Sequence, residues 1–304
     1  METEKQLNGH TISLSSLDKI YFPKEGYTKG DLIDYYERVA EFMLPHIENR
    51  MITMIRFPNG IDDTRFFQKD TPDYFPDWIE TKCIEKKDGG ETHYVICNKQ
   101  ATLVYLANQA CITPHIWLSK KDKPSKPDRL IFDLDPEQDD FAKVKTAAKK
   151  TRELLDERLG LPTFLMTTGS RGLHIVVPLK RTRGFDEVRS FAQKAAELLE
   201  KENPDLLTTA ARKNKRENKI FVDVGRNAFA QTGVAPYAVR PINGAPVATP
   251  LQWKELEEKS ISPQSYNIKN LFKKLDKTGD PWKDIDQAAV VLTTAEKELE
   301  KLLK

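Results

Sequence analysis

Apolar residues recur every three or four positions in four stretches of the chain, which predicts four amphipathic helices. These stretches are 28–45, 141–160, 185–203 and about 286–303. Thr28, followed three residues later by Asp31, forms a capping pair that opens the first helix, and Pro45 ends it. The apolar stripe of the last helix is too short for a stable isolated coiled coil, so we expect that helix to dock on the rest of the chain.

Short apolar or alternating runs separate these helices and predict strands. The runs lie at 51–57, 93–97, 129–136, 163–179 and 219–225, after an extended lead-in at 11–22. The run at 163–179 is interpreted as two strands joined by a glycine turn. Because strands and helices alternate through the middle of the chain, the pattern predicts an α/β or α+β fold built on one central mixed sheet.

Composition narrows the class of protein. The 304 residues carry 48 Lys and Arg against 46 Asp and Glu, a net charge of +2, which excludes a uniformly basic, histone-like protein but permits a local basic groove. The sequence has no apolar run long enough to cross a membrane and no secretory signal at its start. Cys83, Cys97 and Cys111 form no CxxC pair, which argues against a disulfide framework and a zinc ribbon and favours a reducing cytoplasm.

Two carboxylates in the sequence LIFDLDP give the strongest chemical signal. Asp133 and Asp135 alternate along a strand, so both project from the same face. Such carboxylates repel each other unless a cation lies between them, and oxygen ligands suit Mg²⁺ or Mn²⁺ rather than zinc. Asp223, in the strand KIFVDVG, would supply a third carboxylate for a two-metal phosphoryl-transfer centre. The alternative is a strand end that carries solvated acids.

The turn TTGSRGLHI, residues 167–175, is a candidate phosphate cradle. Gly169 and Gly172 permit close approach of the backbone, while the hydroxyls, Arg171 and His174 offer polar contacts. A simple hairpin would account for the same residues equally well.

Basic and aromatic residues offer further candidate contacts to nucleic acid. Basic runs at 120–129 and 211–219 precede the two carboxylate strands, either as solvated loops or as contacts to a phosphate backbone. Phe66 and Phe67 in DDTRFFQKD cannot both face the core of a regular strand. Either one is buried and the other partly covered, or the two form a stacking platform for bases.

The chain resembles the polymerase domain of bacterial ligase D, which belongs to the archaeo-eukaryotic primase superfamily and serves non-homologous end joining. The motifs that carry the resemblance occur in the family's order and are RFPNG, FFQKD, HIWLS, DLDP, TTGSRGLHIVVPL, KIFVDVGRN, VAPYAVRP and GAPVATPLQW. The resemblance covers residues from about 10 to about 256. It implies a single primase-polymerase catalytic domain, 1–304, in which 257–304 form a helical tail. The implied fold is a central mixed sheet of primase-polymerase type with flanking helices and an N-terminal part that binds the DNA end.

The resemblance implies template-directed nucleotidyl transfer at broken DNA ends. Two Mn²⁺ or Mg²⁺ ions are the implied cofactors, and NTPs, preferred over dNTPs, are the implied substrates. The implied catalytic residues and metal ligands are Asp133, Asp135 and Asp223. The implied nucleotide contacts are Arg56, His115, Thr168, Arg171, His174 and Arg240, and the family often has serine where this chain has Thr168.

The resemblance also assigns contacts to DNA. Lys19 and Lys29 match a pair that binds the 5′-phosphate at the downstream edge of a gap. Without the resemblance, both would be interpreted as ordinary surface lysines. Phe66, Phe67 and Arg216 match template contacts. The implied partners are double-stranded DNA ends with 3′ overhangs or gaps, a separate DNA ligase and a Ku-type end-binding protein, in the cytoplasm at the nucleoid and away from any membrane.

A ligase would need a lysine in a KxDG setting, and Lys87-Asp88-Gly89 lacks the intervening residue. We therefore expect either a stand-alone polymerase or an excised domain, and Met1 together with the capped-looking C-terminal helix favours the former. Two alternatives stay open. A replicative-type RNA primase has no evident use for the Lys19 and Lys29 pair, and a non-catalytic DNA-end scaffold has no need of three intact acids.

Overall fold

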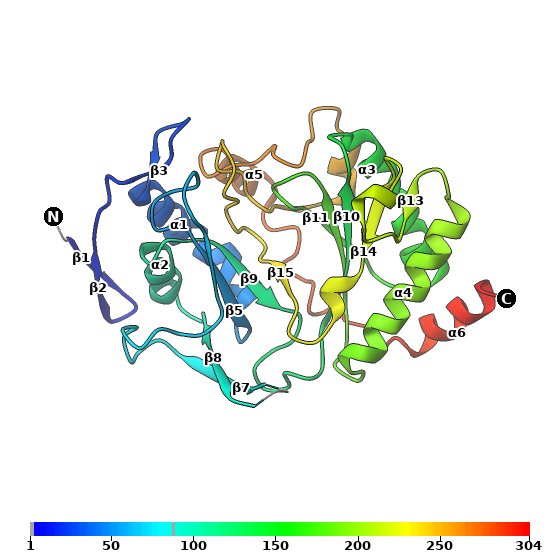
Figure 1. Cartoon of the computed structure of the whole chain (residues 1–304), viewed down its shortest axis with the longest axis horizontal. Coiled ribbons are helices and arrows are strands. Elements are labelled where there is room, and N and C mark those ends of the chain that lie inside the picture. The colour runs from blue at the N-terminus through cyan, green and yellow to red at the C-terminus, as the bar shows by residue number, and fades with distance from the viewer. Residues whose placement is uncertain (1–2, 87–88) are drawn as a thin grey trace. The chain divides into compact units, whose positions relative to one another are not determined.

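The chain folds around two six-stranded sheets, one in each of the two units into which its internal contacts divide it (Figure 1). The computed structural model describes residues 3–86 and 89–304, so Lys87 and Asp88 of the incomplete KxDG motif lie outside the described residues. The first unit comprises residues up to 122, 232–248 and 266–277, and the second comprises 123–231, 249–265 and 278–304. The mixed α/β class is confirmed, whereas the expectation of one central sheet is wrong because each unit has its own.

In the first unit the strand order is β15-β9-β5-β8-β7, and β6 also pairs with β5. The strands of this sheet are β5 (Met51–Arg56), β6 (Phe66–Gln68), β7 (Thr81–Glu85), β8 (Glu91–Ile96), β9 (Cys111–Trp117) and β15 (Thr232–Val234). Two hairpins precede the sheet, β1 (Thr3–Leu7) with β2 (His10–Leu14) and β3 (Ile20–Phe22) with β4 (Tyr27–Thr28). The helices are α1 (Lys29–Ile47), α2 (Gln100–Asn108) and α5 (Leu271–Thr278).

Helix α1 begins where its capping pair predicts. The Thr28 hydroxyl accepts a hydrogen bond from the Asp31 N–H (3.2 Å), and the Asp31 carboxylate accepts one from the Thr28 N–H (2.9 Å). The positions that set its helical period are buried: Leu32, Ile33, Tyr36, Val39, Ala40 and Met43. The helix continues through Pro45 to Ile47, because the missing proline N–H leaves the later bonds intact and the Glu48 N–H still donates to the Leu44 carbonyl (2.9 Å).

In the second unit the strand order is β13-β14-β10-β12-β11-β16, with β13 and β14 parallel and the other pairs antiparallel. Its strands are β10 (Arg129–Pro136), β11 (Phe164–Thr167), β12 (Leu173–Pro178), β13 (Leu207–Thr208), β14 (Ile220–Asp223) and β16 (Pro250–Leu251). Its helices are α3 (Phe141–Arg152), continued by the π-helix η1 (Glu153–Arg158), α4 (Phe185–Glu202) and α6 (Thr293–Leu302). Short 3-10 turns are η2 (Lys213–Lys215), η3 (Gly225–Asn227) and η4 (Trp253–Glu257).

The last helix starts later than its apolar stripe predicts. Residue 286 was expected to lie within it, but α6 begins at Thr293. Val290 instead forms a parallel bridge with Leu179 just beyond β12, donating to the Pro178 carbonyl (3.2 Å) and accepting from the Lys180 N–H (2.8 Å). These bonds hold Val290 in an extended bridge, whereas residues 281–288 before it form turns. In the described part of the chain, no helix is both long and apolar enough to span a bilayer.

Candidate active site

Strand β10 presents two carboxylates on one face and three apolar side chains on the other. Leu130, Phe132 and Leu134 are fully buried. The side chains of Asp133 and Asp135 are 13% and 34% exposed, so both carboxylates are accessible from the opposite face. The shared face expected from their alternation is therefore present.

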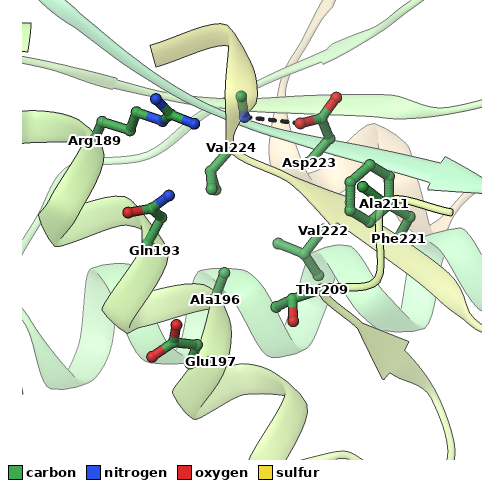
Figure 2. A pocket seen from close by; sticks show the side chains of 11 residues that line it. Arg189, Gln193, Ala196, Glu197, Thr209, Ala211, Phe221, Val222, Asp223 and Val224 are labelled. Atoms are coloured by element: carbon green, nitrogen blue, oxygen red, sulfur yellow. Dashed lines mark hydrogen bonds between the residues drawn. The ribbon is translucent and has the colours of Figure 1, made fainter. Parts of the chain in front are cut away.

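Asp223 joins these acids through strand pairing. The register of β10 and β14 places it directly opposite Asp133, where paired Cβ atoms lie about 4.5–5.5 Å apart. Its carboxylate accepts a hydrogen bond from the Gly225 N–H (2.7 Å), a bond that turns the chain from β14 into η3 (Figure 2). A Cβ at Gly225 would lie only 2.9 Å from the Asp223 oxygen, so a larger residue there would have to displace this carboxylate.

Two guanidinium groups flank the carboxylate of Asp135. Arg216 lies 3.2 Å from one oxygen and Arg171 lies 3.4 Å from the other. Arg216 is 5% exposed, donates to two backbone carbonyls of the preceding loop (3.2 and 3.0 Å) and stacks on the Phe221 ring at 4.2 Å. Arg216 therefore connects its own loop, β14 and the face of β10 that carries the two acids.

Asp133 has a histidine on one side and an arginine nearby. His174 on β12 is its register partner on the side away from Asp223, and the His174 Nε2 lies 3.4 Å from the carboxylate. The His174 side chain is buried, and its Nδ1 has no hydrogen-bond partner among the described residues. Arg226 in η3, with Nε 3.6 Å from the same carboxylate, was missed from the sequence, although it follows Asp223 by three positions in KIFVDVGRN.

The glycine turn is a tight hairpin that Thr168 holds from within. The Thr168 hydroxyl donates to the Gly172 carbonyl (3.1 Å) and accepts from the N–H groups of Ser170 and Gly172 (3.3 Å each). Gly169 adopts a left-handed φ of 66°. A Cβ at Gly172 would lie 2.1 Å from the Leu134 carbonyl oxygen, so the turn packs directly against β10 between its two acids.

A cavity of about 370 Å³ opens beside Asp223 at the edge of β14 (Figure 2). Strand β13 pairs with β14 only at Ile220 and Phe221, so the edge beyond them is left uncovered by β13. Figure 2 shows Arg189 and Gln193 reaching from α4 toward this end of β14. The sequence offered no signal for these α4 residues, because they lie on the polar face of an ordinary amphipathic helix.

In the first unit, Lys19 and Lys29 form a close pair that differs from ordinary surface lysines. Lys29 is 6% exposed, and its ammonium donates to the Ser15 carbonyl (2.7 Å). Burial, and after it the positive charge of Lys19, lowers the pKa of Lys29 to about 8. Lys19 is exposed and donates to the Asn59 side chain (2.6 Å). Two ammonium groups that repel each other in this way favour an anion beside them.

Phe66 and Phe67 are both exposed, at 52% and 61%. The expectation that one of them is buried is wrong, because β6 is a three-residue strand that pairs only with the last residues of β5. Arg56 is the register partner of Phe66, and its guanidinium donates to the Gln109 carbonyl (2.7 Å) and to the Tyr74 hydroxyl (2.9 Å). The two phenyl rings and Arg56 therefore lie at one edge of the first sheet.

His115 lies on β9, and Arg240 lies in a segment that bonds to the same strand. His115 sits in the sheet between β5 and β15, where its register partner on β15 is Val234. Arg240 follows Val239, whose carbonyl accepts a bond from the Thr113 hydroxyl (2.5 Å), two residues before His115. The structure thus groups these two residues in the first unit, and the three acids, Thr168, Arg171, His174 and Arg216 in the second.

Comparisons with known proteins agree on one family. The family model described as LigD, primase-polymerase domain, matches residues 28–282. The multifunctional non-homologous end joining DNA repair protein LigD of Mycobacterium tuberculosis is 34% identical over 289 residues, which cover 92% of this chain and 38% of that protein. The bifunctional non-homologous end joining protein LigD of Bacillus subtilis is 33% identical over 275 residues, 90% of this chain and 44% of that protein.

A solved structure gives the same result. The polymerase domain from Mycobacterium tuberculosis ligase D in complex with DNA superposes with a TM-score of 0.85 at 33% identity, covering 91% of this chain and 99% of that one. The chain spans about two fifths of the length of the curated relatives it matches.

Proposed function

The chain belongs to the LigD primase-polymerase family of nucleotidyltransferases, and on this premise we propose that it fills gaps and extends 3′ ends at DNA double-strand breaks during non-homologous end joining. One observation carries the proposal, the strand register that sets Asp133 between Asp223 on β14 and His174 on β12. Three carboxylates on one face of a sheet, beside a glycine turn, suit phosphoryl transfer better than simple DNA binding.

The three aspartates fit two Mn²⁺ or Mg²⁺ ions, because their donors are all carboxylate oxygens, the ligands these hard ions prefer. Such ions, when bound, would activate a primer 3′-hydroxyl and neutralise the triphosphate of the incoming nucleotide. The chain's own part is to hold the acids in register. His174 positions the Asp133 carboxylate, and the Gly225 N–H positions that of Asp223.

The glycine turn would hold the nucleotide. Arg171 and His174 are proposed to contact its phosphates, because a guanidinium and a buried ring nitrogen without a partner among the described residues both suit phosphate oxygens. Since the Thr168 hydroxyl is already bonded within the turn, its proposed role is to shape the cradle. The family resemblance extends the nucleotide contacts to Arg56, His115 and Arg240, with ribonucleotides preferred.

The DNA end would be gripped through the first unit. Lys19 and Lys29 suit a dianionic 5′-phosphate at the downstream edge of a gap, since an anion would relieve the repulsion between their ammonium groups. Phe66 and Phe67 expose their rings for stacking on template bases, and Arg216 is proposed as a further template contact.

The proposed partners are DNA ends with 3′ overhangs or gaps, a separate DNA ligase and a Ku-type end-binding protein, in the cytoplasm at the nucleoid. The proposed catalytic domain is the whole of 1–304. A replicative-type primase and a DNA-end scaffold are the alternatives that an experiment has to exclude.

Extension of a labelled primer across a short gap tests the proposal. Reactions with Mn²⁺ or Mg²⁺, with NTPs or dNTPs, and with or without a downstream 5′-phosphate should show templated addition that prefers NTPs with Mn²⁺ and is stimulated by the phosphate. Asp133→Ala should abolish addition while DNA binding is retained. The double variant Lys19→Ala, Lys29→Ala should lose only the stimulation, with Lys24→Ala as its matched control.

The other results separate the alternatives. Addition that ignores the phosphate would favour the primase. Tight DNA binding without any addition, in every combination of metal and nucleotide, would leave the scaffold.

A further inference from the structure

A cluster of three metal-binding side chains lies on the β7–β8 hairpin of the first unit. Cys83, Glu91 and His93 each offer one ligand atom, and these atoms all lie within 4.8 Å of one another. The His93 Nε2 and a Glu91 carboxylate oxygen are 3.6 Å apart. No role in nucleotidyl transfer accounts for this grouping, and it was not expected from the sequence, where the three cysteines lack metal-ligand spacing.

Strand pairing brings the three side chains to one face. Cys83 on β7 is the register partner of His93 on β8, and Glu91 lies two residues before His93 on the same strand. Both backbone groups of His93 bond elsewhere. Its N–H donates to the Asp70 carboxylate (2.6 Å), and its carbonyl accepts from the Thr71 N–H (2.8 Å) and hydroxyl (2.6 Å).

These bonds fix the geometry of the pair. Because the His93 backbone bonds to the 70–71 loop, Cys83 and His93 form a non-hydrogen-bonded cross-strand pair, the type in which opposing side chains lie closest. The 70–71 loop also anchors His93 from outside the hairpin. The imidazole and the thiol are therefore held near each other before any ligand arrives.

The local charge favours a cation. Glu85 is the register partner of Glu91 and lies on the same face as Cys83. Two carboxylates, those of Glu85 and Glu91, therefore lie on the face that carries the Cys83 thiol. A divalent cation placed between these groups would offset that crowding of negative charge.

We propose that Cys83, Glu91 and His93 bind a thiophilic divalent cation of the Zn²⁺ class, with Glu85 or a water molecule as the fourth ligand. Thiolate, imidazole and carboxylate are the three ligand types that zinc takes in proteins, at about 2.0–2.3 Å from the ion. The three ligand atoms lie within 4.8 Å of one another, so small side-chain rotations would place all of them around one ion. The thiolate separates this site from the three aspartates of the second unit, whose all-oxygen set suits Mn²⁺ or Mg²⁺.

The ion would cross-link the two strands of the hairpin. The register pairs of β7 and β8 end at Glu85 and Glu91, so an ion bound to Cys83, Glu91 and His93 would join the two strands within their last three pairs. Because such an ion binds the folded hairpin, it would stabilise that hairpin by mass action.

Cobalt titration of the whole, reduced chain tests the proposal, because a thiolate bound to Co²⁺ gives a ligand-to-metal charge-transfer band in the near ultraviolet. The titration is made in an Asp133→Ala, Asp223→Ala background, which removes oxygen ligands from the second unit. We expect the band to saturate at one equivalent and to disappear when Zn²⁺ is added. Cys83→Ser should abolish the band, Glu91→Gln and His93→Ala should weaken Co²⁺ binding at least tenfold, and His10→Ala should leave it unchanged.

Circular dichroism and thermal unfolding of each variant without metal show whether it folds. A reduced Asp133→Ala, Asp223→Ala chain that gives no saturable band would overturn the proposal. So would a band that persists in Cys83→Ser, because the thiolate would then come from Cys97 or Cys111, or unchanged Co²⁺ binding in a folded Glu91→Gln and a folded His93→Ala. None of these results depends on polymerase activity.

Discussion

Replacing Gly172 with alanine tests how the glycine turn holds the acids of β10. The added Cβ would lie 2.1 Å from the Leu134 carbonyl oxygen, where an ordinary contact begins at 3.4 Å. The backbone φ of Gly172 is not positive, so the cost of the substitution is steric rather than conformational. The turn and β10 must therefore separate by about 1 Å, and the displaced carbonyl belongs to the residue between Asp133 and Asp135.

The size of the effect follows from this displacement. A shift of about 1 Å in positioned catalytic groups costs about 100-fold in rate. Forcing one extra methyl group into a packed interior costs about 1–3 kcal/mol of stability. We therefore expect Gly172→Ala to fold, to unfold at a lower temperature and to lose about 100-fold in single-turnover primer extension.

Gly184→Ala is the matched control. A Cβ at Gly184 would meet only the Glu187 carboxylate, at an ordinary 3.5 Å, so this variant should extend the primer at the wild-type rate. Single-turnover extension and a Mn²⁺ titration of both variants give the comparison. Wild-type rate and wild-type Mn²⁺ dependence in Gly172→Ala would refute the argument that the turn fixes the two acids.

Three further predictions concern charge and exposed rings. Stimulation by a downstream 5′-phosphate should fall as pH rises through about 8, because the Lys29 amine is neutral above its lowered pKa; equal stimulation ratios at about pH 7 and about pH 9 would contradict this. Arg216→Ala should tighten calorimetric Mn²⁺ binding about tenfold by removing a charged hydrogen bond from Asp135, and unchanged affinity would count against that competition. Phe67→Ala should change the free energy of unfolding by less than about 0.5 kcal/mol, because the ring is exposed. It should weaken single-stranded template binding, measured by fluorescence anisotropy, by about 1–3 kcal/mol. A variant that loses stability but binds the template as the wild type does would contradict the stacking role.

Elements with a strong local pattern could be predicted from the sequence. The strand expected at 129–136 is β10, Arg129–Pro136, and the helix expected at 185–203 is α4, Phe185–Glu202. In both, the alternation or the helical period is uninterrupted and the ends carry stop signals. The start of α1 could be predicted for the same reason, because the capping pair at Thr28 fixes the first turn, whereas the helix runs past the stop expected at Pro45 to Ile47.

Elements that depend on distant contacts could not be predicted. Helix α2 is buried at seven of its nine positions, so it shows no polar face and no helical period to detect. The separate sheet of the first unit was missed because β9 and β15 come from segments more than a hundred residues apart, and Pro114 interrupts the pattern of β9. The bridge between Leu179 and Val290 delays α6 for the same reason.

In the candidate site too, local relations could be predicted from the sequence and distant ones could not. Alternation alone predicts that Asp133 and Asp135 share a face, because that relation is local. The pairing of Asp133 with both Asp223 and His174 is a register across three strands, which only the fold supplies. The roles of these residues in catalysis stay predictions, which the variants above address.

Three arginines offset the negative charge of the acids on β10. Asp135 lies between Arg171 and Arg216, and Asp133 lies beside Arg226, so carboxylates that would repel one another are held together by guanidinium groups. Cations that bind Asp135 must compete with these groups for the same oxygens. Because Arg216 is also bonded to its own loop and stacked on Phe221, its release from Asp135 is coupled to movement of residues 210–216. Metal affinity should therefore depend on the conformation of that loop, and a ligand that draws Arg216 away should strengthen Mn²⁺ binding by the same factor as Mn²⁺ strengthens binding of the ligand.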